Sequence, residues 1–196
     1  MPLASSPPSS PTVCRLFDRH DGQRRLTIRP IRLFGDPVLR SACDPITPGD
    51  QRAVGLIDDL LEGVALPGRA GLAANQIGVG QRAFSYNVDG EIGYIINPVI
   101  AELSGEPELV DEGCLSVPGF FFQRLRYPEA RVTGIDLNGN PVELSGTGLM
   151  AQALQHETDH LDGHLFIEGL EPDVKREAMK AIRASTWWRT GASSVS

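Results

Sequence analysis

The chain has 196 residues, of which 41% are hydrophobic and 22% charged, a composition typical of a globular domain with a sizeable core. Its formal net charge of −7 argues against general binding to nucleic acid or to an anionic membrane surface, because both partners attract basic surfaces. No stretch approaches the roughly 20 consecutive apolar residues of a membrane span. We therefore expect no membrane partner and no sequence-specific nucleic acid binding.

The cysteines and the N-terminal segment indicate the compartment and the domain limits. Cys14, Cys43 and Cys114 are too few and too scattered for a disulfide framework, so a reducing cytoplasm is the expected setting. The start of the chain is rich in Ser and Pro and lacks the apolar run of a secretory signal, and its few arginines suggest a transit peptide only weakly. We expect a disordered extension at residues 1–25, a single catalytic domain at 26–190 and a flexible tail at 191–196.

The first elements are a strand and a helix. The strand is expected at residues 27–33. The helix should follow with Thr47 as its N-cap and Pro48 in its first position, and Pro67-Gly68 should end it. Its buried face should contain four apolar residues at near-helical spacing: Val54, Ile57, Leu61 and Val64.

Two hairpins are predicted from their turn residues. The first has strands at 82–88 and 91–99 around Asp89-Gly90, and the second has strands at 131–137 and 141–144 around Asn138-Gly139-Asn140. Between them, residues 112–119 are bounded by Gly and Pro, which is typical of a strand end or a loop.

Two further helices complete the predicted domain. One should run over residues 148–162, between Thr147 as cap and Gly163 as stop. The other should run from Pro172 towards Trp188, with one side formed by Val174, Ala178, Ala181 and Trp188. Because strands and helices are segregated along the chain, the predicted fold is α+β with mostly antiparallel sheets around the helix at 148–162, plus an N-terminal and a C-terminal helix.

The strongest chemical signal is His156-Glu157-Thr158-Asp159-His160, an HExxH motif in the predicted helix at 148–162. Helix residues four apart share a face, so both imidazoles can bind one metal ion, with Glu157 beside them to act on a water molecule. The histidines fall in register with apolar Leu149 and Ala153, which favours a buried metal pair over two exposed histidines.

A mononuclear catalytic site usually needs a third protein ligand. In one metalloprotease pattern this is a histidine six residues after the second one, but that position holds Phe166, and His164 comes two positions early. A downstream glutamate would be the other protease solution, and its candidates are Glu168, Glu171 and Glu177. Cys114 is a further candidate, because a thiolate is a soft anionic donor.

Two more segments make the pattern specific. They are Gly71-Leu72-Ala73-Ala74-Asn75-Gln76 and Glu112-Gly113-Cys114-Leu115-Ser116, and with the HExxH motif they resemble the three ordered motifs of the peptide deformylase family. The resemblance runs from about Ile28 to Leu170. It implies a metal-dependent hydrolase that removes the N-formyl group from the N-terminal formyl-methionine of nascent proteins and releases formate.

The resemblance also implies a role for each motif residue. The metal ligands would be Cys114, His156 and His160, and the general base would be Glu157. The oxyanion donors would be the Gln76 amide and the backbone N–H of Leu115, and the substrate would lie against Ala70, Gly71, Glu112 and Gly113. Family members use one divalent ion, natively Fe2+, with Zn2+, Ni2+ or Co2+ as replacements. Ligand softness alone would favour zinc.

The chain departs from the family pattern at two places. Arg69 stands where the family has a glycine, which affects the expected substrate path rather than the metal chemistry. Phe120-Phe121-Phe122 stand where many members have an arginine, and Arg124 follows later. Three adjacent aromatic residues indicate either core packing or an apolar rim on the substrate groove.

Alternative functions are an HExxH endopeptidase, which would use a Glu or His third ligand, and an inactive metal-binding homologue.

Formyl-Met nascent polypeptides are the expected partners. A contact to the ribosome through the C-terminal helix is a further hypothesis, because basic residues outnumber acidic ones there; a solvated helix face would explain the same charges. The basic residues are Lys175, Arg176, Lys180, Arg183 and Arg189.

Overall fold

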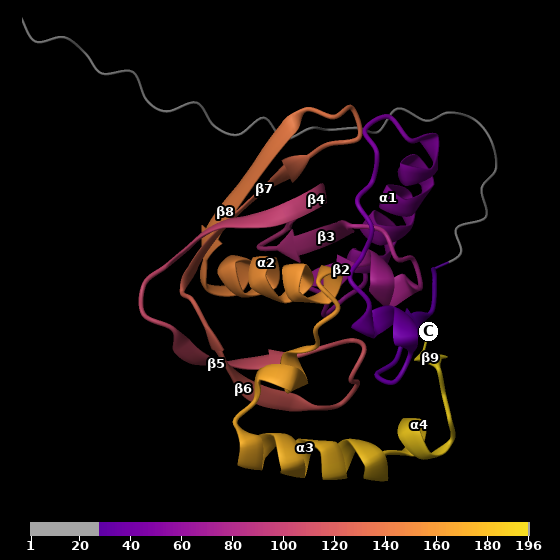
Figure 1. Cartoon of the computed structure of the whole chain (residues 1–196), viewed down its shortest axis with the longest axis vertical. Helices are drawn as coiled ribbons and strands as arrows, with labels where there is room; N and C mark the ends of the chain where they lie inside the picture. The colour runs from indigo at the N-terminus through magenta and orange to yellow at the C-terminus, as the bar shows by residue number, and fades with distance from the viewer. Residues whose placement is uncertain (1–27, 196) are drawn as a thin grey trace, which may run out of the picture.

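The computed structural model describes residues 28–195 and contains helices and antiparallel sheets, which confirms the predicted α+β class (Figure 1). The predicted extension at residues 1–25 lies outside the described residues. The strands are β1 (Ile31–Arg32), β2 (Gly71–Ala73), β3 (Ala83–Val88), β4 (Glu91–Ser104), β5 (Glu108–Gly113), β6 (Phe121–Arg126), β7 (Glu129–Ile135), β8 (Pro141–Thr147) and β9 (Ser194–Val195). The helices are α1 (Gln51–Val64), α2 (Gly148–Leu161), α3 (Pro172–Ala184) and α4 (Thr186–Arg189), with 3-10 turns η1 (Pro37–Arg40), η2 (Ala74–Ile77) and η3 (Phe166–Gly169).

The large sheet has the strand order β2-β3-β4-β7-β8, and neighbouring residues of its strands alternate between two hydrophobic cores. Leu72, Ala83 and Ile96 belong to the core around α1, whereas Ala73, Phe84 and Ile95 belong to the core around α2. Because successive side chains of a strand point to opposite faces, α1 and α2 cover opposite faces of this sheet. The HExxH helix is therefore held against the sheet centre.

A third core joins the hairpin β5–β6 to the C-terminal helices, which lie below α2 in Figure 1. It contains Val117 from the loop after β5, Phe166 from η3, and Ala178 and Ile182 from α3. This core fixes the loop that follows β5 relative to α2. No helix of the described chain is long and apolar enough to cross a membrane.

The prediction for the first helix is correct in position and wrong in detail. The N-cap is Asp50, whose side chain accepts a hydrogen bond from the Arg52 backbone, and Thr47 and Pro48 precede the helix. The buried face is formed by Ala53, Leu56, Ile57, Leu60, Gly63 and Val64. Val54 is 41% exposed. The neighbouring side of the helix packs against the sheet instead, and this side carries the larger side chains of Leu56 and Leu60.

The C-terminal helix is interrupted, which corrects the prediction of one helix reaching Trp188. Ser185 is extended, and its hydroxyl accepts a hydrogen bond from the Trp188 backbone and so starts α4. A serine side chain that bonds nearby backbone competes with continuation of the helix. Only Ala178 and Ile182 of α3 are buried, whereas Val174 and Ala181 are exposed.

Both predicted hairpins are present, although β4 continues to Ser104 beyond its expected end. The expected strand at 27–33 is reduced to β1 in the described part of that range. β1 pairs with β9, and the Leu33 backbone donates to Ser193. The described part of the expected flexible tail, residues 191–196, therefore includes a paired strand.

Candidate active site

The two motif histidines lie side by side on α2, and Cys114 reaches them from the loop after β5. Their Nε2 atoms are 3.1 Å apart, and Cys114 Sγ lies 3.2 Å from His160 Nε2. The donor atoms of all three residues lie within 4.8 Å of one another. Among the described residues, Cys114 is thus the third donor in this cluster, and His164 and the downstream glutamates are not part of it.

The loop that carries Cys114 is held from several sides. The Cys114 carbonyl accepts a hydrogen bond from Val117, and the Ser116 carbonyl accepts one from the Phe34 backbone. The indole N–H of Trp187 donates to the Pro118 carbonyl at 3.2 Å. These contacts fix the thiol against the histidines.

Glu112 orients one of the histidines. Its Oε1 lies 2.7 Å from His156 Nδ1, and both of its oxygens accept hydrogen bonds from Arg126, which also binds Asp159. Burial would raise the pKa of Glu112, but the hydrogen bonds from Arg126 and His156 outweigh it and hold that pKa at about 2. The buried carboxylate therefore directs His156 Nε2 towards Cys114 and His160. Its predicted contact with substrate stays a prediction.

Glu157 is buried beside the cluster, and its Oε2 has no hydrogen-bond partner in the described structure. Burial raises the pKa of this carboxyl to about 7. Gly71 of β2 packs against it so closely that a Cβ on Gly71 would overlap the carboxylate. A buried acceptor without a partner beside three metal donors is suited to bind a water molecule or substrate proton.

The amide of Gln76 is held in one orientation. Its Oε1 accepts a hydrogen bond from the Ala73 backbone, so its NH2 group points to Ser116 Oγ at 3.2 Å and to Cys114 Sγ at 3.5 Å. Leu115 follows the thiol directly, and its side chain packs partly against the α1 core. The two predicted oxyanion donors therefore flank Cys114.

The donor set fits a metal ion. Donors bound to one tetrahedral ion at about 2.0–2.3 Å stand roughly 3.3–3.7 Å apart, close to the separations of 3.1 and 3.2 Å in the cluster. One thiol and two imidazoles suit a transition metal rather than calcium or magnesium.

The residues that depart from the family pattern, Arg69 and Phe120-Phe121-Phe122, pack in different ways. Arg69 donates a hydrogen bond to the Gly63 carbonyl at the end of α1. Phe120 stacks on Phe122, and Phe122 stacks on Phe166, so both belong to the third core. Phe121 is 72% exposed. The aromatic run is thus divided between core packing and an exposed surface.

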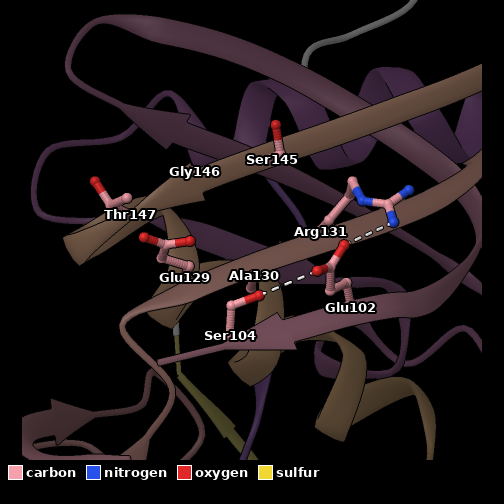
Figure 2. Close-up of a pocket in the computed structure, with 8 residues that line it drawn as sticks. All are labelled: Glu102, Ser104, Glu129, Ala130, Arg131, Ser145, Gly146 and Thr147. Carbon is pink, nitrogen blue, oxygen red and sulfur yellow. Dashed lines mark hydrogen bonds and ion pairs between the residues drawn. The ribbon is translucent and has the colours of Figure 1, made fainter. Parts of the chain in front are cut away.

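A pocket of about 300 Å³ lies elsewhere, on β4, β7 and β8 (Figure 2). Ion pairs with Glu102 and Glu143 neutralise Arg131, and Ser104 donates a hydrogen bond to Glu102. None of the predicted site residues lines this pocket. The pocket is therefore separate from the cluster of Cys114, His156 and His160.

Several residues around the site are not predicted from the sequence. Arg126 and Asp159 complete the Glu112 network, and Asn75 donates a side-chain hydrogen bond to the His160 carbonyl. Asp159 lies inside the HExxH motif, and this position is the only signal for it in the sequence. Arg126 could not be found, because only the fold brings it to Glu112.

An α+β fold with an HExxH helix against a sheet and a third donor beside it defines the class of mononuclear metal hydrolases. Residues 28–176 match the family model described as polypeptide deformylase. The peptide deformylase of Acidothermus cellulolyticus is 48% identical over 162 residues, which cover 83% of this chain and 89% of the relative. That of Corynebacterium glutamicum is 44% identical over 167 residues, covering 83% and 99%.

Solved structures agree. A peptide deformylase from Legionella pneumophila matches with a TM-score of 0.76 and 35% identity over 85% of this chain and 98% of that chain. The chain belongs to the polypeptide deformylase family. It is a metal-dependent hydrolase that removes the N-formyl group from nascent polypeptides.

Proposed function

We propose that Cys114, His156 and His160 hold one divalent metal ion and that Glu157, Gln76 and Leu115 carry out deformylation around it. The observation that supports this most directly is the closed Cys-His-His cluster next to a buried carboxylate. When bound, the ion would supply the Lewis acidity that activates water and polarises the formyl carbonyl.

In this proposal Glu157 moves the proton. Its unpartnered Oε2 accepts the proton of the attacking water and then delivers it to the nitrogen of the departing amine. Burial raises the pKa of this carboxyl above its ordinary value, so the carboxylate is a stronger base towards water and the carboxylic acid can still release its proton to the amine. Formate and a free N-terminus are the products.

Gln76 and Leu115 would stabilise the negative charge that develops on the formyl oxygen. Ala73 already holds the Gln76 carbonyl, so the amide N–H needs no reorientation during the reaction. A single donor of this kind contributes about 3–4 kcal/mol to transition-state stabilisation. The backbone N–H of Leu115 is the second donor.

We propose that the substrate binds along the backbones of Ala70, Gly71 and Gly113 and also contacts Glu112. β2 is an edge strand of the large sheet, and β5 pairs only with β6 in the described structure. The Asp111 carbonyl of β5 already accepts a hydrogen bond from Gln152 of α2, so the edges left for an added strand are that of β2 and the Gly113 end of β5. A peptide lying along such an edge gains main-chain hydrogen bonds. Gly71 borders Glu157, and Gly113 precedes Cys114, so both edges reach the reaction centre.

We propose Fe2+ as the native ion, as the family resemblance implies, with Zn2+, Ni2+ or Co2+ as replacements. Metal analysis of protein purified without oxygen tests this. Equimolar iron in active protein would support it, and equimolar zinc with full activity would contradict it.

Two substrates test the function. We expect formate release from formyl-Met-Ala-Ser and no fragments from casein. Casein cleavage without formate release would favour the HExxH endopeptidase, and metal binding without either activity would favour the inactive homologue.

We also propose a cytoplasmic setting and a contact between α3 and ribosomal RNA. Lys180 and Arg183 on α3 are exposed, and so is Arg176, whose ion pair with Asp173 lies at the surface. Ribosome co-sedimentation should weaken as salt rises, and at low salt it should already be weaker in a variant with Arg176→Glu and Arg183→Glu than in the wild type. Arg40→Glu, an exposed change on η1, is the control. Equal binding by wild type and both variants would contradict the contact.

A further inference from the structure

The outer face of the β5–β6 hairpin carries three exposed apolar side chains, at its two ends, with the polar pair Asp111–Gln123 between them. Phe121 is 72% exposed, Leu109 59% and Leu125 54%. Leu109 lies directly opposite Leu125, and Gly113 lies opposite Phe121. Side chains two or four residues apart on a strand share a face, so these three residues form one surface, called here the apolar strip.

Packing of the hairpin does not explain the apolar strip. The other face makes the core contacts: Phe122 stacks on Phe166, and Arg126 binds Glu112. Single exposed leucines are common on protein surfaces, but here Leu109 and Leu125 face each other across the two strands and Phe121 is mostly exposed on the same face, so the hairpin offers two apolar contact points separated by Asp111 and Gln123.

The Phe121 end of the apolar strip lies next to the loop that carries Cys114, on the hairpin face opposite to Glu112. The ring of Phe121 lies across Gly113, where a Cβ would stand 2.5 Å from a ring carbon, and Gly113 directly precedes Cys114. From Gly113 to Leu109 the strand advances by four residues, or about 13 Å. The strip is therefore long enough to accompany about four residues of an extended peptide whose end lies at the metal cluster.

We propose that the apolar strip binds the nascent chain downstream of the formyl-methionine and selects apolar residues there. This rests on the proposed function, because it assumes that the formyl group reaches Cys114, His156 and His160. Phe121 contacts the first apolar residue after the methionine, and the Leu109–Leu125 pair contacts another about four positions further along. Asp111 and Gln123 pair between them on the same face, so an acidic residue at the intermediate position is disfavoured by Asp111.

A positional scan tests the proposal. In peptides with formyl-Met followed by six residues, one leucine is moved through a background of alanine and serine, and kcat/KM is measured for each. We expect two maxima about four positions apart, each about tenfold above the background. Phe121→Ser should remove the maximum nearer the methionine, and Leu125→Ser the farther one.

Val99→Ser is the matched control. Val99 is 57% exposed on β4 of the large sheet, outside the hairpin, so this variant should keep both maxima. Melting temperature and metal content establish that each variant is folded. The scan of the wild type requires no variant and tests the apolar preference by itself.

The outcomes separate this inference from the proposed function. A flat scan by a wild type that releases formate from formyl-Met-Ala-Ser would overturn the apolar strip alone. Two maxima that both survive Phe121→Ser and Leu125→Ser would also overturn it. Failure to release formate from any peptide would overturn the proposed function and this inference together.

Discussion

Gly71 of β2 lies against the carboxylate of Glu157 on α2, with no room for a side chain between them. The contact exists because α2 packs on the sheet face next to the edge strand β2. A glycine here lets the β2 backbone and the proposed general base approach each other, which any larger residue would prevent.

Gly71→Ala should displace Glu157 and lower formate release by at least about 100-fold, the lower range for losing a general base. Metal content should stay at the wild-type level, because the three donors are untouched. Gly80→Ala is the control, since a Cβ at Gly80 meets no atom within 4 Å. Wild-type activity in Gly71→Ala would mean that Glu157 tolerates displacement and is not the base.

Glu157→Ala should keep the metal and lose turnover by about 100- to 10,000-fold, because Glu157 lies between the ligands without being one of them. Metal stoichiometry and kcat on formyl-Met-Ala-Ser are the measurements. If the variant lost its metal as readily as a His156 variant, Glu157 would have to be a ligand.

Cys114→Ser should lose metal on dialysis and activity with it, because only two histidines of the cluster would remain. Cobalt-substituted wild type should have a thiolate-to-metal charge-transfer band that is missing in Cys114→Ser. Cys14→Ser and Cys43→Ser serve as controls and should retain the band. Persistence of the band in Cys114→Ser would assign the third ligand to another residue.

Glu112→Gln should weaken metal binding by about 10- to 100-fold while leaving all three donors in place. The pKa of Glu112 of about 2 makes it an anion at neutral pH, and the neutral amide would orient His156 less strongly. Competition with a chelator measures the affinity, and the melting temperature of the metal-free protein monitors structural damage. Glu106→Gln, at an exposed turn, is the control; equal affinities in the two variants would contradict the positioning role.

Cys43 gives a pH-dependent prediction. Burial raises the pKa of this thiol from 9.0 to about 11. Below pH 9 the thiol is protonated in both the folded and the unfolded chain, so stability should not depend on it. Between pH 9 and 11 only the unfolded chain releases the proton, so folding stability should fall. Cys43→Ala should lessen that fall in urea unfolding, and an identical pH profile would contradict the raised pKa.

Local chemistry explains which parts of the fold could be predicted. Asp89 and Gly90 have φ of 53° and 85°, as a tight hairpin turn requires, and the dipeptide alone indicates that turn. The β5–β6 hairpin has a long loop from Cys114 to Phe120. Its Gly and Pro residues indicate a strand end or loop, but they do not indicate that the strands on either side pair with each other.

The buried face of α1 and the break in α3 depend on packing partners. Ile57 and Val64 fit two alternative helical stripes, and only the sheet decides that Leu56 and Leu60 face inward. Ser185 interrupts the last helix where Trp188 stacks on Phe34, a residue far earlier in the chain. Neither the buried face of α1 nor the break at Ser185 can be predicted from the neighbouring residues in the sequence alone.

In the site, too, features set by local sequence could be predicted and features set by tertiary contacts could not. The helical spacing of His156 and His160 predicts a shared face, and the structure places both in the cluster. The orienting contact of Glu112 could not be predicted, because Arg126 and His156 reach it from β6 and α2.

The pairing of β1 with β9 has a consequence for the connectivity of the chain. Ile31 lies opposite Val195 and Arg32 opposite Ser194, so the last described strand ends where the first begins (Figure 1). This is the geometry of a hairpin whose turn has been cut. A turn of a few residues between Val195 and Pro30 would close the backbone into a ring. New termini opened at the exposed Asp89-Gly90 turn would then give a circular permutant with every site residue in place.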